Sequence, residues 1–162
     1  EKYYHEILGY NARMDGIQGA VLRTKLKHLD DWNESRREVA NWYQELLSDA
    51  PLGLPPNDID NGQVFHVYVV ETDRRDELRT YLEEHGIGTN IHYPIPIHLQ
   101  EAYEFLPLEK GAFPIAEKCA NEVVSLPMFP ELHFRQVARV IETVNEILSK
   151  TPVTFIENAQ YA

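Results

Sequence analysis

The first third of the chain carries apolar residues at helical spacing. Between residues 17 and 29 they are Ile17, Val21, Leu22, Leu26 and Leu29, and their spacings of three and four indicate one buried helical face. The pattern continues to residue 47, and Pro51, Gly53, Pro55 and Pro56 then exclude a helix. We therefore predict a helix that begins near Asp15. It continues either as one long helix or as two, with a bend between residues 28 and 32, where the apolar face changes phase.

Three segments have the composition of β-strands. Residues 64–70 are rich in β-branched and aromatic side chains, and residues 87–93 and 122–126 follow a similar pattern. Between the first two segments we expect a helix with Asp73 as its N-cap and Gly86 as its left-handed C-terminal residue. His66 is expected to be a core or sheet-face residue of the first strand, and Trp32 and Trp42 are expected to be packing residues.

The second half of the chain alternates between a proline-rich segment and helices. Residues 94–107 contain three prolines, which predicts a loop with at most a short helix near residues 99–105. Pro114 is expected to open a short helix that runs through residue 121. The last helix has a single apolar stripe, formed by Phe134, Val137, Ile141, Val144 and Leu148. Together these elements predict an α+β fold, a small sheet with helices on one side.

Composition narrows the class of protein. The chain has 162 residues, 43% hydrophobic and 25% charged, and no apolar run approaches the roughly 18 residues of a membrane span. We expect a soluble protein without a membrane partner. The net charge of −11 disfavours nucleic acid. No secretory signal is recognisable, and a single cysteine, Cys119, is compatible with a reducing cytoplasm.

Two polar residues stand at the approach to the first predicted helix. Asn11 and Arg13 lie between Gly9 and Asp15, where free N–H groups, an amide and a guanidinium could converge on a phosphate. The alternative is that Asn11 makes a turn and Arg13 pairs with an acidic neighbour. Local features alone leave both readings open.

Longer motifs connect the chain to a known family. Residues 4–22 read YHEILGYNARMDGIQGAVL, residues 92–100 read HYPIPIHLQ, and residues 125–128 read SLPM. In this order, they resemble the DegT/DnrJ/EryC1/StrS family of sugar aminotransferases over nearly the whole chain. The resemblance implies the small C-terminal domain of a fold-type I transferase that depends on pyridoxal 5'-phosphate (PLP), with a long N-terminal linking helix and a small, mainly antiparallel sheet. It places the end of the large domain and the linking helix in residues 1–30, the small domain in 31–150 and a tail in 151–162.

The resemblance also implies roles for individual residues. Asn11 and Arg13 would hold the cofactor phosphate in the site of a neighbouring subunit of a homodimer, and Tyr4 and His5 would approach the nucleotide-sugar across that interface. His92, Tyr93 and His98 would face the nucleotide or the sugar. A histidine pair six residues apart is not a usual metal-ligand spacing, so no metal site is expected.

The family places the lysine that bonds the cofactor in the large domain, and no matching segment occurs here. Two hypotheses follow. In the first, the chain is part of an enzyme that transfers an amino group, from glutamate, to a keto sugar of a nucleotide-sugar, and is inactive alone. In the second, it is a truncated or stand-alone binding or dimerisation module. The family also contains dehydratases, and the choice between the two chemistries lies outside these residues.

Overall fold

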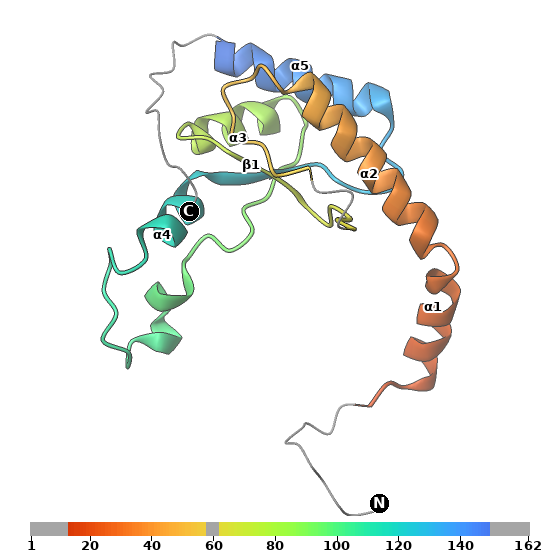
Figure 1. The fold of residues 1–162 in the computed structure, drawn as a ribbon, viewed down its shortest axis with the longest axis horizontal. Coiled ribbons are helices and arrows are strands. Elements are labelled where there is room, and N and C mark those ends of the chain that lie inside the picture. Colours follow the sequence, from red (N-terminus) through yellow and green to blue (C-terminus); the bar gives the residue numbers. More distant parts are fainter. Residues whose placement is uncertain (1–12, 58–61, 150–162) are drawn as a thin grey trace, which may run out of the picture. The chain divides into compact units, whose positions relative to one another are not determined.

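The computed structural model describes residues 13–57 and 62–149. Figure 1 shows the fold and labels the α-helices and strand β1. The chain divides into two compact units, Glu1–Trp32 and Asn33–Ala162.

The first unit contains helix α1 (Gly16–Leu26) and the first turn of helix α2 (Leu29–Leu46). Asp15 caps α1 through a reciprocal pair of hydrogen bonds: its carboxylate accepts from the Gln18 N–H at 2.8 Å, and the Gln18 side chain accepts from the Asp15 N–H at 3.3 Å. The predicted start near Asp15 is confirmed. A turn at residues 27–28 separates α1 from α2, so the two-helix alternative is correct and the break begins just before the expected bend.

The apolar face of α1 differs from the prediction. No residue of α1 is buried, and the Ile17 side chain is 80% exposed. The expectation of a buried face is therefore wrong within the described chain. The helical spacing is real, but no described residue covers that face of α1.

The second unit is built around a two-stranded antiparallel sheet. Strand β1 (Tyr68–Glu71) pairs with strand β2 (Val123–Leu126), with Tyr68 opposite Leu126 and Glu71 opposite Val123. Figure 1 shows helices α3 (Arg75–Glu84) and α5 (Phe134–Ser149) together on one side of this sheet, and helix α4 (Pro114–Glu122) leads directly into β2. The predicted α+β class is confirmed.

The core of this unit joins the sheet to α2, α3 and α5. Its fully buried members include Tyr43 of α2, Tyr68 of β1, Leu78 of α3, Val124 of β2 and Val144 of α5. The predicted stripe of the last helix is buried at Val137, Ile141, Val144 and Leu148, whereas Phe134 is half exposed and packs edge-on against Trp42.

Two predicted strands were too long, because the backbone leaves the extended region at particular residues. Phe65 has a positive φ of 48°, so β1 begins at Tyr68 rather than at residue 64. The strand expected over residues 87–93 is reduced to one bridge between Asn90 and Ser125, and Tyr93 has a φ of 64°. The strand expected at 122–126 is present as β2.

Helix ends were predicted with mixed success. Arg74, not Asp73, is the N-cap of α3, and it makes no side-chain cap. Gly86, with a φ of 72°, ends α3 as expected: its N–H bonds to the Glu83 carbonyl and the Ile87 N–H bonds to the Leu82 carbonyl. Among the described residues no helix is both long and apolar enough to cross a membrane.

Candidate functional site

The residues proposed to hold a cofactor phosphate are only partly described. Tyr4, His5 and Asn11 lie outside the described residues. Arg13 lies two residues before the N-cap of α1 and is exposed. Its guanidinium makes no ion pair with a described residue, so the alternative of an acidic partner is not observed. The Asp15 carboxylate already accepts from the Gln18 N–H at this helix end, so what Arg13 offers a phosphate is an exposed guanidinium two residues before the N-cap.

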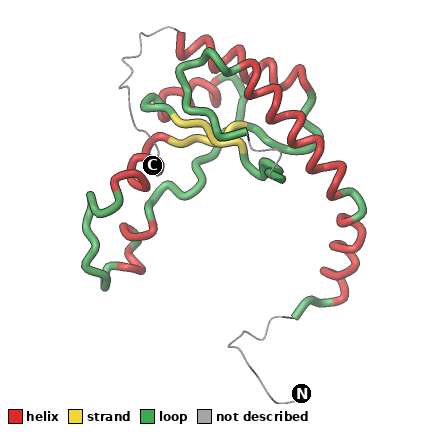
Figure 2. Tube along the Cα trace, viewed as in Figure 1, coloured by secondary structure: helices red, strands yellow, loops and turns green. Residues whose placement is uncertain are grey.

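The other predicted residues lie together in the second unit. The segment between α3 and α4 is mostly loop (Figure 2), with two short 3-10 turns, η2 (Ile97–Leu99) and η3 (Glu101–Tyr103). This segment and α4 enclose an open cavity of about 920 Å³ that His92, Tyr93 and His98 all line. The short helix expected near residues 99–105 is therefore present as 3-10 turns.

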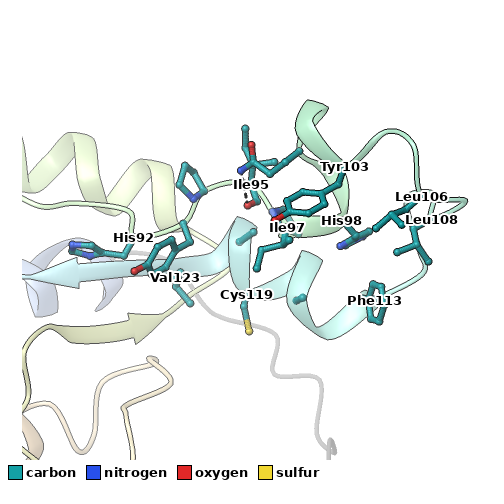
Figure 3. Close-up of a pocket in the computed structure, with 16 residues that line it drawn as sticks. His92, Ile95, Ile97, His98, Tyr103, Leu106, Leu108, Phe113, Cys119 and Val123 are labelled. Carbon is teal, nitrogen blue, oxygen red and sulfur yellow. Dashed lines mark hydrogen bonds between the residues drawn. The ribbon is translucent and has the colours of Figure 1, made fainter. Parts of the chain in front are cut away.

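Most of this cavity is apolar. Figure 3 shows side chains from the loop and from α4 converging on it. Its apolar lining includes Ile95, Ile97, Leu106, Leu108, Phe113 and Val123. Cys119 of α4 also lines the cavity. Cys119 is a free, partly buried thiol.

His98 is held by a carboxylate from α4. Its Nε2 lies 2.9 Å from Glu117 Oε1, and the two side chains are only 6% and 11% exposed. Its ring also packs edge-on against Phe113. Nε2 is therefore engaged within the protein, and His98 contributes to the cavity as part of its wall.

Glu117 also organises the turn before α4. The same Oε1 accepts a hydrogen bond from the Gly111 N–H at 2.7 Å and a longer one from the Phe113 N–H at 3.4 Å. Gly111 has a φ of 96°, which glycine adopts without strain. The Gly111 N–H, and after it His98, lower the pKa of Glu117 because they favour its charged form. The carboxylate thus ties the loop to the helix.

His92 and Tyr93 are oriented differently. His92 Nδ1 lies 2.7 Å from Ser125 Oγ on β2, which fixes the plane of the ring. Tyr93 is 86% exposed, and its positive φ precedes Pro94. A non-glycine residue in this region costs about 1 kcal/mol or more, and such strain is concentrated at functional sites. The Tyr93 phenol is therefore exposed to solvent, while the Tyr93 backbone is held in a strained conformation.

A second cavity of about 360 Å³ adjoins the first at His92. His66, Asn90 and Ser125 are among the residues that line it. His66 is exposed and lies before β1, not within it. The expectation of a core or sheet-face histidine is wrong, because the positive φ of Phe65 turns the chain at this point.

The described lysines do not suit a covalent bond to a cofactor aldehyde. Lys25, Lys27 and Lys110 are exposed. Lys118 is 58% exposed and pairs with Glu71 at 2.5 Å. Its hydrogen bond with Glu71 raises its pKa, which keeps the amine protonated. Nor does the described part of the chain hold a group of three or more His, Cys, Asp or Glu residues that could bind a metal.

Sequence reasoning missed the partners of the two loop histidines. Ser125 is 33 residues from His92 and Glu117 is 19 residues from His98. Ser125 belongs to the SLPM motif of residues 125–128, and this motif could have indicated that Ser125 is part of the site. Glu117 had no local signal, because its role depends on where α4 packs.

Comparison with known proteins adds to this geometry. The profile of the DegT/DnrJ/EryC1/StrS aminotransferase family matches residues 1–145. The chain is 46% identical, over 147 residues, to a dTDP-3-amino-3,4,6-trideoxy-alpha-D-glucose transaminase of Streptomyces venezuelae, covering 90% of this chain and 39% of the relative.

Solved structures are also similar to this chain in fold. The S. venezuelae protein DesV, crystallised in complex with a ketimine intermediate, is 44% identical with a TM-score of 0.84 over 94% of this chain and 41% of its own. NtdA of Bacillus subtilis, with bound cofactor PMP, is 25% identical with a TM-score of 0.76 over 92% of this chain and 36% of its own. The chain thus spans about 40% of the length of the curated relatives it matches.

Proposed function

Because the chain belongs to the DegT/DnrJ/EryC1/StrS aminotransferase family, we propose that it is the carboxy-terminal part of a PLP-dependent enzyme that transfers an amino group to the keto sugar of a nucleotide-sugar. The observation that carries this proposal is the 46% identity, across 90% of this chain, to a relative named as a nucleotide-sugar transaminase. Relatives with such names favour the enzyme over a stand-alone binding module. We further propose glutamate as the amino donor, a homodimer as the assembly and the cytoplasm as its location.

The chain's contribution is to bind and orient. Asn11 and Arg13 hold the cofactor phosphate in the neighbouring subunit's site, and this is supported by the exposed position of Arg13, which has no ion-pair partner among the described residues and lies two residues before the N-cap of α1. Tyr4 and His5 approach the nucleotide-sugar across the same interface. When bound, the cofactor supplies an electron sink for moving a proton at the carbon that carries the amino group.

The substrate contacts come from the loop that follows α3. His92 and Tyr93 face the nucleotide-sugar, supported by the fixed ring of His92 and the exposed phenol of Tyr93. His98 acts as part of the wall, because its Nε2 is held by Glu117. We place the lysine that bonds the cofactor in another part of the protein, and this is supported by the described lysines, each of which is exposed or paired with carboxylates.

This proposal is tested with the complete protein and PLP. Reduction with borohydride followed by peptide mapping should locate one modified lysine outside these 162 residues, and amino transfer from glutamate to a nucleotide-linked keto sugar should be detected. Asn11→Ala should raise the dissociation constant of PLP by about tenfold, the loss of one hydrogen bond to a charged group. The matched control, Asn121→Ala on α4, should bind PLP normally. A borohydride-fixed adduct at Lys118 would contradict the assignment.

A further inference from the structure

None of the described residues that line the smaller cavity beside His92 is acidic. Its lining consists of His66, Val67, Gly88, Thr89, Asn90, His92, Ser125, Leu126, Pro127 and Met128. The whole chain carries 26 Asp and Glu residues and a net charge of −11. A cavity whose described polar side chains are His66, Thr89, Asn90, His92 and Ser125, with no carboxylate among them, differs from the acidic character of the chain and can accept an anion.

His66 is directed to this cavity by its neighbour. Phe65, 3% exposed, packs in the core, with its ring centroid 6.2 Å from that of Tyr68. The positive φ of Phe65 allows its ring to point inward while the next residue lies at the surface. The His66 imidazole has no hydrogen-bond or ion-pair partner among the described residues.

Two other polar groups of the cavity can donate hydrogen bonds: His92 Nε2, in the tautomer in which Nδ1 accepts from the Ser125 hydroxyl, and the Asn90 NH₂ group. Ser125 Oγ occupies His92 Nδ1, which leaves Nε2 without a partner in the described ranges. Asn90 Oδ1 accepts the Ile91 N–H at 2.9 Å, and its NH₂ group has no partner among the residues that the structure describes. Imidazole and amide N–H groups around a cavity of about 360 Å³ can bind a small oxyanion.

Both histidines lie next to a strained residue. Phe65 precedes His66 and Tyr93 follows His92, and these two are the only non-glycine residues with positive φ in the part of the chain that the structure describes. Strain of this kind persists where the surrounding structure holds it, and it is concentrated at ligand sites. That it occurs beside both histidines of one cavity is an observation independent of the cavity's composition.

We propose that His66 and His92 together form a subsite for an anionic oxygen group of a ligand. The anionic group is either a phosphate of the nucleotide-sugar or a carboxylate of the amino donor. This choice of ligands rests on the proposed function. His66 is thus a further ligand-binding residue, which sequence reasoning had assigned to packing.

The test compares the complete protein with His66→Gln and His133→Gln, by calorimetric titration with inorganic pyrophosphate and, separately, with glutarate. His133 is also an exposed histidine and lines neither cavity, so His133→Gln is the matched control. His66→Gln should raise the dissociation constant of one probe by about tenfold or more, as expected for the loss of a hydrogen bond to a charged group. His133→Gln should leave both constants unchanged.

The outcomes are distinct. A loss confined to pyrophosphate identifies the nucleotide phosphates as the source, and a loss confined to glutarate identifies the amino donor. Equal affinity of His66→Gln and the unsubstituted protein for both probes would overturn the subsite. Melting temperatures are measured in parallel, because an exposed side chain should be replaceable without unfolding. If amino transfer is absent but the His66-dependent affinity is present, the proposed function fails and the subsite stands.

Discussion

At the scale of single residues, Glu117 connects the loop of the candidate site to α4. Its Oε1 accepts from the Gly111 N–H and faces His98 Nε2, at 2.7 and 2.9 Å. Both partners belong to a segment with little regular structure. The position of the larger cavity's wall therefore depends on one carboxylate.

Glu117→Gln is expected to lower the melting temperature at neutral pH. The folded state lowers the pKa of Glu117, so its stabilisation is complete above the ordinary glutamate value of 4.5 and is lost as the pH falls through the lowered pKa. Melting curves of the two proteins should therefore converge on acidification below that value. Glu104→Gln, in the same loop and exposed, is the control. A difference that persists unchanged in acid would show that the charge of Glu117 is not the stabilising feature.

Two stacked tyrosines in the core offer a second test. Tyr43 and Tyr68 are fully buried with ring centroids 4.7 Å apart, and burial raises the pKa of both phenols. The Tyr43 hydroxyl donates to the Pro127 carbonyl at 3.0 Å, whereas the Tyr68 hydroxyl has no partner among the described residues. Tyr43→Phe should destabilise by about 1 kcal/mol, and Tyr68→Phe should be neutral or stabilising. Urea unfolding measures both, and equal losses would refute the distinction.

At the scale of elements, α1 depends on its cap rather than on packing. It has 11 residues, none of them buried, and isolated helices of this length are marginal in water. The reciprocal hydrogen bonds between Asp15 and Gln18 are its most specific stabilising feature. The elements of the second unit differ, because each contributes side chains to a shared core.

Asp15→Ala should therefore affect α1 alone. Loss of such a cap costs about 1 kcal/mol, roughly a fivefold loss of helix population. Amide hydrogen exchange should be faster in α1 and unchanged in α5, which serves as the internal reference. Faster exchange in both helices would mean that the cap supports the whole chain.

At the scale of the whole molecule, the exposed apolar residues of α1 are the main indication that this chain works with other protein surfaces. Ile17, Val21 and Leu22 are all exposed, and contiguous apolar patches seldom remain uncovered in soluble proteins. The chain spans about 40% of the length of its curated relatives. We propose that the rest of the protein or a second subunit covers this face.

The 162-residue chain alone should therefore bind a hydrophobic dye or self-associate. Replacing Val21 and Leu22 by Lys should reduce dye fluorescence and association, since both side chains lie on the exposed face. Thr24→Lys on the same helix, which adds charge without removing an apolar group, is the control. Sedimentation as a compact monomer that binds no dye would refute the proposal.

Local signals in the sequence predicted the helices and the family. Apolar spacing indicated α1, α2 and α5, Pro114 marked the start of α4, and Gly86 marked the end of α3. These features depend on residues within a few positions of one another. The long motifs were likewise sufficient for the family assignment that the profile match supports.

The tertiary structure decided the rest, because it depends on groups distant in the chain. Positive φ values at Phe65 and Tyr93 shortened the strands, and the turn at Phe65 exposed His66. The partners of His92 and His98 lie 33 and 19 residues away. Apolar spacing showed which face of α1 is apolar but not whether this chain covers it. Burial is a property of the packed assembly, whereas helical periodicity is a property of the local sequence.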